Sequence, residues 1–176
     1  MNKEEGPPVK IHLDRMEGEL DSDILALYKS KTISLRRKPK VRFEGEPAVG
    51  SGPVSEFFTL SMRFLEEGFS INEKVTVLEG EADHKVPVAN TMLRKTGMYE
   101  MFGKMIGHSI LHGGPGIYGL SPAVVHYLAV DNVKENPPSY SLLDVADVDL
   151  RGIIGQVCYI ILFYTKRQCY LLLFVI

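Results

Sequence analysis

The chain has 176 residues and a formal net charge of −2, from 20 lysines and arginines against 22 aspartates and glutamates. Its length allows one domain of ordinary size, and 45% hydrophobic with 24% charged residues is typical of a globular protein, which excludes a disordered or collagen-like chain. The lack of surplus positive charge argues against a protein whose main task is to coat nucleic acid. Only two cysteines, Cys158 and Cys169, are present, so we expect no disulfide framework and an intracellular protein of the cytoplasm or nucleus.

The first 30 residues are predicted to form a leader and a short helix. Residues 1–10 contain charged residues and prolines but no apolar run like that of a signal peptide, so we expect a frayed leader. An amphipathic helix is predicted over 19–28, because four apolar side chains recur there at helical spacing: Leu20, Ile24, Leu27 and Tyr28.

Extended segments and a long helix are predicted for the middle of the chain. Apolar and polar residues alternate over 33–43, which indicates extended chain interrupted at Pro39. The apolar spacing over 54–65 predicts an amphipathic helix that ends at Gly68. Valines that flank polar residues over 74–88 predict a hairpin or two short strands.

Three more helices are predicted before the end of the chain. The first covers 98–110, Ser121 and Pro122 open the second as N-cap and first helical residue, and the third begins near Leu150. We therefore expect residues 31–157 to form an α+β domain that is mostly helical, with short strands or hairpins.

Residues 158–176 form an apolar tail of uncertain origin, interrupted only by the four residues 165–168. Its β-branched and aromatic content favours a buried strand pair, although the interruption lacks the glycine, asparagine or aspartate of a tight turn. A truncated or mispredicted chain end is an equally good interpretation. A membrane anchor is the least favoured, because about 20 consecutive apolar residues are needed to span a bilayer.

His108 and His112 lie four residues apart, so on a helix they share one face and could bind a metal together. Zinc proteases of this spacing have a glutamate after the first histidine, where this chain has Ser109, and no third ligand is obvious nearby. We therefore favour two packed histidines near the C-terminal end of the helix, where positive charge meets the helix dipole favourably.

Two further patterns are better explained by structure than by chemistry. Glycine-rich residues 113–119 follow a helix rather than a strand, which favours a helix end and turn over a phosphate-binding loop. Glu44 and Glu46 would point to opposite faces of an extended chain, so they would not act together on a substrate as acid and base.

The remaining candidates are a basic cluster and the two thiols. Arg36, Arg37 and Lys38 could bind anions or direct nuclear import, but a solvated edge strand is favoured. A nucleophilic role for Cys158 or Cys169 needs a neighbouring base or cation, and their apolar sequence surroundings would instead raise the thiol pKa. From the residues alone we assign no catalytic, cofactor-binding or metal-binding residue.

Three segments resemble, in the same order, conserved parts of HECT-type ubiquitin ligase domains. The first, over 41–58, has a strand that ends in Phe43 and a Gly-Glu pair, then a glycine loop and a helix rich in phenylalanine. The second, over 102–115, resembles a family helix with Gly-Lys and a second glycine one turn later, and the third, over 120–128, resembles the helix that follows. The similarity is to the divergent vertebrate branch named for the transition into mitosis.

The resemblance covers residues 31–157 and implies the beginning of a HECT N-lobe. HECT enzymes accept ubiquitin from a conjugating enzyme as a cysteine thioester and pass it to a substrate lysine. The implied partners are therefore ubiquitin, a ubiquitin-conjugating enzyme and protein substrates, with no nucleic acid and no membrane.

The chain also departs from the family pattern. Its glycine loop has Gly50, Ser51 and Gly52 where family members carry an aspartate and paired glycines. The part that docks the conjugating enzyme and the C-lobe with its cysteine have no counterpart, and neither Cys158 nor Cys169 lies in the family's cysteine motif. We therefore expect a partial ubiquitin transferase that is inactive alone and uses no cofactor. The alternative is a non-catalytic module that binds ubiquitin or ligase partners.

Overall fold

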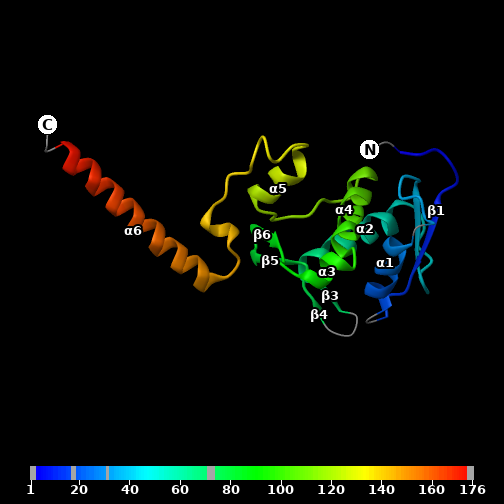
Figure 1. Cartoon of the computed structure of the whole chain (residues 1–176). Coiled ribbons are helices and arrows are strands. Elements are labelled where there is room, and N and C mark those ends of the chain that lie inside the picture. The colour runs from blue at the N-terminus through cyan, green and yellow to red at the C-terminus, as the bar shows by residue number, and fades with distance from the viewer. Residues whose placement is uncertain (1–2, 17–18, 31, 71–73, 174–176) are drawn as a thin grey trace. The chain divides into compact units, whose positions relative to one another are not determined.

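The computed structural model describes residues 3–16, 19–30, 32–70 and 74–173, the last of these as backbone only from residue 163 (Figure 1). The chain divides into two compact units. The first comprises Met1–Leu78 and Pro87–Tyr118, and the second comprises Glu79–Val86 and Gly119–Ile176. Helices and short strands occur together along the chain, which confirms the α+β class.

The first unit begins with two parallel strands joined through a helix. Strand β1, Val9–Leu13, pairs with strand β2, Pro39–Phe43, in a register that sets Val9 opposite Pro39 and Leu13 opposite Phe43. The crossover contains helix α1, Glu19–Lys29, as a parallel pair requires. The helix over 19–28 is thus confirmed, but β1 was not predicted, and Val9 and Lys10 belong to it rather than to a frayed leader.

The alternation in the two strands gives their sheet one buried face. Ile11, Leu13, Val41 and Phe43 are each at most 3% exposed, and the residues between them are exposed. Helix α1 packs against β1, and helix α2, Ser51–Glu67, packs against β2. The strands therefore present their polar side chains to solvent and their apolar ones to the helices.

Helix α2 confirms the prediction over 54–65 and begins three residues earlier, at Ser51. It ends at Gly68, as predicted, because this residue has a φ of 97° and a Cβ there would lie 2.8 Å from the carbonyl oxygen of Val75. The apolar side of α2 faces helix α4, Met98–Leu111, which confirms the helix predicted over 98–110. A short helix that was not predicted, α3, spans Thr91–Lys95.

Between α2 and α3 the chain forms two small antiparallel pairs. Strands β3, Phe69–Ser70, and β4, Lys74–Val75, pair antiparallel. Strands β5, Leu78–Glu81, and β6, His84–Pro87, form the second pair. The hairpin predicted within 74–88 is confirmed by this second pair.

The second unit contains the β5–β6 turn and the last three helical elements. Helix α5, Pro122–Ala129, starts as predicted, because the Ser121 side chain accepts a hydrogen bond from the backbone N–H of Val124 at 3.1 Å. The segment before it pairs with β6, since the N–H of Ser121 donates to the carbonyl of Lys85 at 2.9 Å. A 3₁₀ helix, η1, follows at Leu142–Asp144.

Helix α6 spans Val148–Leu173 and confirms the helix predicted to begin near Leu150. The strand pair considered for the tail is wrong, because residues 158–173 continue α6 without a break. A helix that has already started gains one hydrogen bond for each added residue, and 165–168 contain no turn-forming residue to stop it. Within the part of the chain that the structure describes, no helix is both long enough and apolar enough to span a membrane.

Candidate functional site

Of the histidine pair, His108 lies in the core of the first unit, where α4 packs against α1 and α2, and His112 is half-buried directly after α4. His108 is 2% exposed, and its Nδ1 lies 2.8 Å from the hydroxyl of Tyr28, at hydrogen-bond distance. The ring of Phe58 meets the imidazole edge to face, with centroids 5.0 Å apart. Burial, and to a smaller extent the neighbouring His112, lowers the pKa of His108 to about 4. Burial also raises the pKa of Tyr28, so both side chains are neutral at pH 7.

His112 has its own hydrogen bond, because its Nε2 donates to the carbonyl oxygen of Leu35 at 3.0 Å. Its ring stacks on Phe58 and stands perpendicular to His108, 5.0 Å away between centroids. The prediction of two packed histidines is confirmed, but its charge argument is wrong, because burial keeps His108 neutral. Among the described residues no three metal-binding side chains lie close enough to hold an ion.

The glycine-rich segment after α4 is a helix end, as predicted. The N–H of Gly113 donates to the carbonyl of Ile110 at 3.2 Å, and the N–H of Gly114 donates to the carbonyl of Ser109 at 2.8 Å. A Cβ on Gly114 would lie 2.5 Å from Oγ of Ser109 and 2.7 Å from Cβ of Phe58. The amides of Gly113 and Gly114 therefore complete the helix and are not available to a phosphate group.

The two glutamates and the basic cluster lie at the surface of the first unit. Glu46 forms an ion pair with Arg15, whereas Glu44 lines a depression of about 380 Å³ with His12, Arg42 and Gly45. The two carboxylates thus have different surroundings, but the extended chain expected there is wrong, because Glu44 and Gly45 form a turn.

The basic cluster occupies a turn before β2, so the expected edge strand over 36–38 is wrong. Arg37 pairs with Glu4 at 3.1 Å, and the Ser34 hydroxyl donates to Glu4 at 2.5 Å. These two partners, Ser34 first, lower the pKa of Glu4. The ion pair ties Glu4 to this turn.

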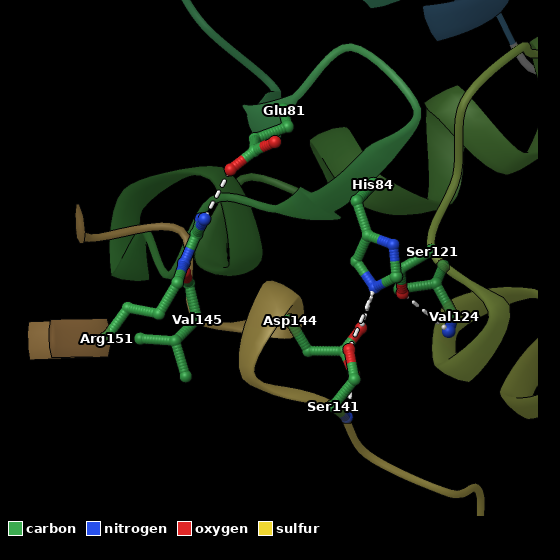
Figure 2. A network of polar contacts seen from close by, with 8 residues as sticks. All are labelled: Glu81, His84, Ser121, Val124, Ser141, Asp144, Val145 and Arg151. Carbon is green, nitrogen blue, oxygen red and sulfur yellow. Dashed lines mark hydrogen bonds and ion pairs between the residues drawn. The ribbon is translucent and has the colours of Figure 1, made fainter. Parts of the chain in front are cut away.

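A second polar cluster, in the second unit, was not predicted (Figure 2). Nε2 of His84 lies 3.0 Å from Oδ1 of Asp144 and 3.3 Å from Oγ of Ser141, and Figure 2 shows the three side chains converging. Next to them Arg151 of α6 pairs with Glu81 and donates from Nε to the carbonyl of Val145 at 2.9 Å. No sequence motif could have revealed this cluster, because His84 and Asp144 are 60 residues apart.

The three residue types of the cluster are those of a serine hydrolase, but their geometry is different. In a catalytic triad the carboxylate and the hydroxyl bind opposite nitrogens of the histidine, whereas Asp144 and Ser141 both meet Nε2 of His84. The other oxygen of Asp144 accepts a hydrogen bond of 2.6 Å from the backbone N–H of Ser141, which is the capping box of η1. The cluster therefore clamps η1 onto the β5–β6 turn and does not activate a nucleophile.

The charge of Asp144 fits this structural role. Burial raises the pKa of its carboxyl, whereas hydrogen bonds from the Ser141 backbone, Ser121 and His84 lower it. The combined effect of the hydrogen bonds is the larger, so the net shift of the pKa is downward. The side chains of His84 and Asp144 are only 12% and 11% exposed. A carboxylate held ionised beside a shielded imidazole is a stable anchor for the loop before α6.

Cys158 lies on α6 and is exposed, so the apolar burial inferred from its sequence surroundings is wrong. No hydrogen bond or ion pair of the described side chains joins this thiol to a base or a cation. The side chain of Cys169 lies outside the described residues. The structure therefore shows no base or cation that would activate the thiol of Cys158.

No protein-family model matches the chain, and a search of curated proteins finds no match.

Proposed function

We propose that this chain forms part of the N-lobe of a HECT-type ubiquitin-protein ligase and contributes binding rather than chemistry. The observation that supports this is the packing of the first two resembling segments against each other. Phe58, from the segment 41–58, contacts the ring of His108 and closely approaches Gly114, both from the segment 102–115. Residues that carry the resemblance therefore meet in one core, as residues retained for a common fold would.

The binding role is supported by the lack of an activated thiol among the described residues. HECT chemistry needs a cysteine thiolate that accepts ubiquitin, and Cys158 has no base or cation as a partner. His108 is buried and used for packing, and the polar cluster at His84 holds a loop. We infer that the chain presents surfaces to ubiquitin, a conjugating enzyme or other parts of a ligase, inside the cytoplasm or nucleus.

A charging assay tests the catalytic part of this proposal. The full chain is incubated with activating enzyme, conjugating enzyme, ATP and ubiquitin, and adducts are resolved with and without reducing agent. We expect no adduct that reducing agent removes. Such an adduct would overturn the non-catalytic assignment. Its loss in either Cys158→Ser or Cys169→Ser, but not in both, would identify the nucleophile.

Direct binding tests the interaction part. Helix α5, in the third resembling segment, exposes Val125, Tyr127 and Leu128 by 50%, 59% and 68%, which favours a docking surface for a protein. We expect isotope-labelled ubiquitin or conjugating enzyme to show localised chemical-shift changes with the full chain. Leu128→Ser should weaken them, whereas Val49→Ser, at a residue that is 73% exposed in the other unit, should not. Unchanged spectra for both proteins would remove the support for this proposal.

A further inference from the structure

The outward face of the β1–β2 pair carries four basic side chains in two facing rows. The register sets Lys10 opposite Lys40 and His12 opposite Arg42. All four residues are exposed, because the alternation of the strands buries only their neighbours. We call Lys10, His12, Lys40 and Arg42 the basic face.

The four side chains have no acidic partner within the described chain. None of them takes part in an ion pair or a side-chain hydrogen bond, although Arg15 and Arg37 in the same unit do pair with glutamates. Like charges directly opposite each other on one face destabilise a strand pair. The arrangement costs the fold stability, and an external anion would relieve the repulsion.

The dimensions of the basic face fit an extended peptide. Alternate residues of a strand are about 6.6 Å apart and neighbouring strands about 4.8 Å apart, so the four side chains form a compact patch of two rows, one alternate-residue step long on each strand. A peptide in extended conformation directs every second side chain to one side at the same repeat. Carboxylates at alternate positions of such a peptide match the step from Lys10 to His12 on β1 or from Lys40 to Arg42 on β2.

The end of the basic face favours a peptide over a nucleic acid. Glu44 lies in the turn directly after β2 and lines the depression with His12 and Arg42. A nucleic acid carries a negative charge at every nucleotide and would bring one against Glu44, whereas a peptide can place a neutral or basic residue there. The net charge of −2 for the whole chain also disfavours a long polyanion.

We propose that the basic face docks an acidic segment of a partner protein, bound in extended conformation with carboxylates at alternate positions. This inference does not rest on the proposed ligase function, because it uses only the charges and register of β1 and β2. A failure to bind an acidic peptide would therefore count against the basic face alone, and a failure to bind ubiquitin would count against the proposed ligase function alone.

The test measures binding of a fluorescent extended peptide with glutamates at alternate positions to the full chain. We expect binding that weakens several-fold between about 50 mM and about 200 mM NaCl, because exposed charges are screened over that range. The double variant Lys10→Glu, Lys40→Glu should weaken binding about tenfold or more, since each reversal replaces an attraction with a repulsion. The matched control Arg94→Glu, Lys95→Glu makes the same charge change at exposed residues of α3 and should weaken it much less.

Five results would overturn the proposal. The first three are no binding, equal losses in the two double variants, or tighter binding of a single-stranded oligonucleotide or an anionic vesicle of equal charge. A peptide with the same glutamates in one block must also bind several-fold more weakly, because equal affinity would mean diffuse attraction without register. The milder double variant Lys10→Gln, Lys40→Gln must also bind the peptide more weakly, and circular dichroism checks that this variant is folded. Unchanged affinity of the folded variant would refute the assignment.

Discussion

The buried imidazole of His108 should make the stability of the first unit depend on pH. The ordinary pKa of histidine is 6.5, and burial lowers that of His108 to about 4. When the pH falls below 6.5, the unfolded chain takes up a proton that the folded chain does not accept until the pH approaches 4. The stability present above pH 6.5 is therefore lost between these two values, and no further loss from this group occurs below the lower one.

The size of the effect follows from the two pKa values. One unit of pKa difference corresponds to about 1.4 kcal/mol. Between about pH 7 and about pH 5 the proton uptake of the unfolded chain lowers the free energy of unfolding by about 2 kcal/mol. The side chain is 2% exposed, so solvent screening does not reduce this value greatly.

Urea unfolding of the full chain, followed by circular dichroism at both pH values, measures the effect. His108→Gln keeps a polar side chain beside Tyr28 but cannot titrate, so its loss on acidification should be smaller by about 2 kcal/mol. Tyr28→Phe removes the hydrogen bond of 2.8 Å but leaves the imidazole buried, and should keep most of the pH dependence. If wild type and His108→Gln lose the same free energy, the buried neutral imidazole cannot be correct.

Three further substitutions test other parts of the structure. Gly114→Ala should lower the free energy of unfolding by about 1–3 kcal/mol in the same urea titration, because its Cβ would overlap a buried phenylalanine. Gly103→Ala is the control and should be neutral or stabilising, because its Cβ would meet no neighbouring atom within 4 Å. Asp144→Ala removes the carboxylate that binds His84 and caps η1 and should speed hydrogen exchange throughout η1; unchanged exchange would contradict the clamp. Asn90→Ala removes the side chain that caps α3, at a cost of about 1 kcal/mol, and exchange in α3 slower than or equal to wild type would contradict the cap.

Local patterns identified most of the helices. Helix α2 follows from apolar spacing and the glycine that ends it, and α5 follows from Ser121 and Pro122, because caps and amphipathic spacing act within a few residues. Strand β1 was missed although apolar and polar residues alternate over Val9–Leu13, because so short an alternation does not identify a pairing partner that lies beyond a whole helix. The tail was misjudged because its composition suits a strand, while its conformation is inherited from the helix before it.

The sequence by itself determined the periodic elements, the helix ends at Gly68 and Gly113, and the poor match of His108 and His112 to a metal site. Only the tertiary structure decided the environment of each polar side chain. It buried His108 against Tyr28, and it joined His84 to Asp144 across 60 residues. The reason is that hydrogen bonds and desolvation depend on distance in space, whereas periodicity and capping depend on distance along the chain.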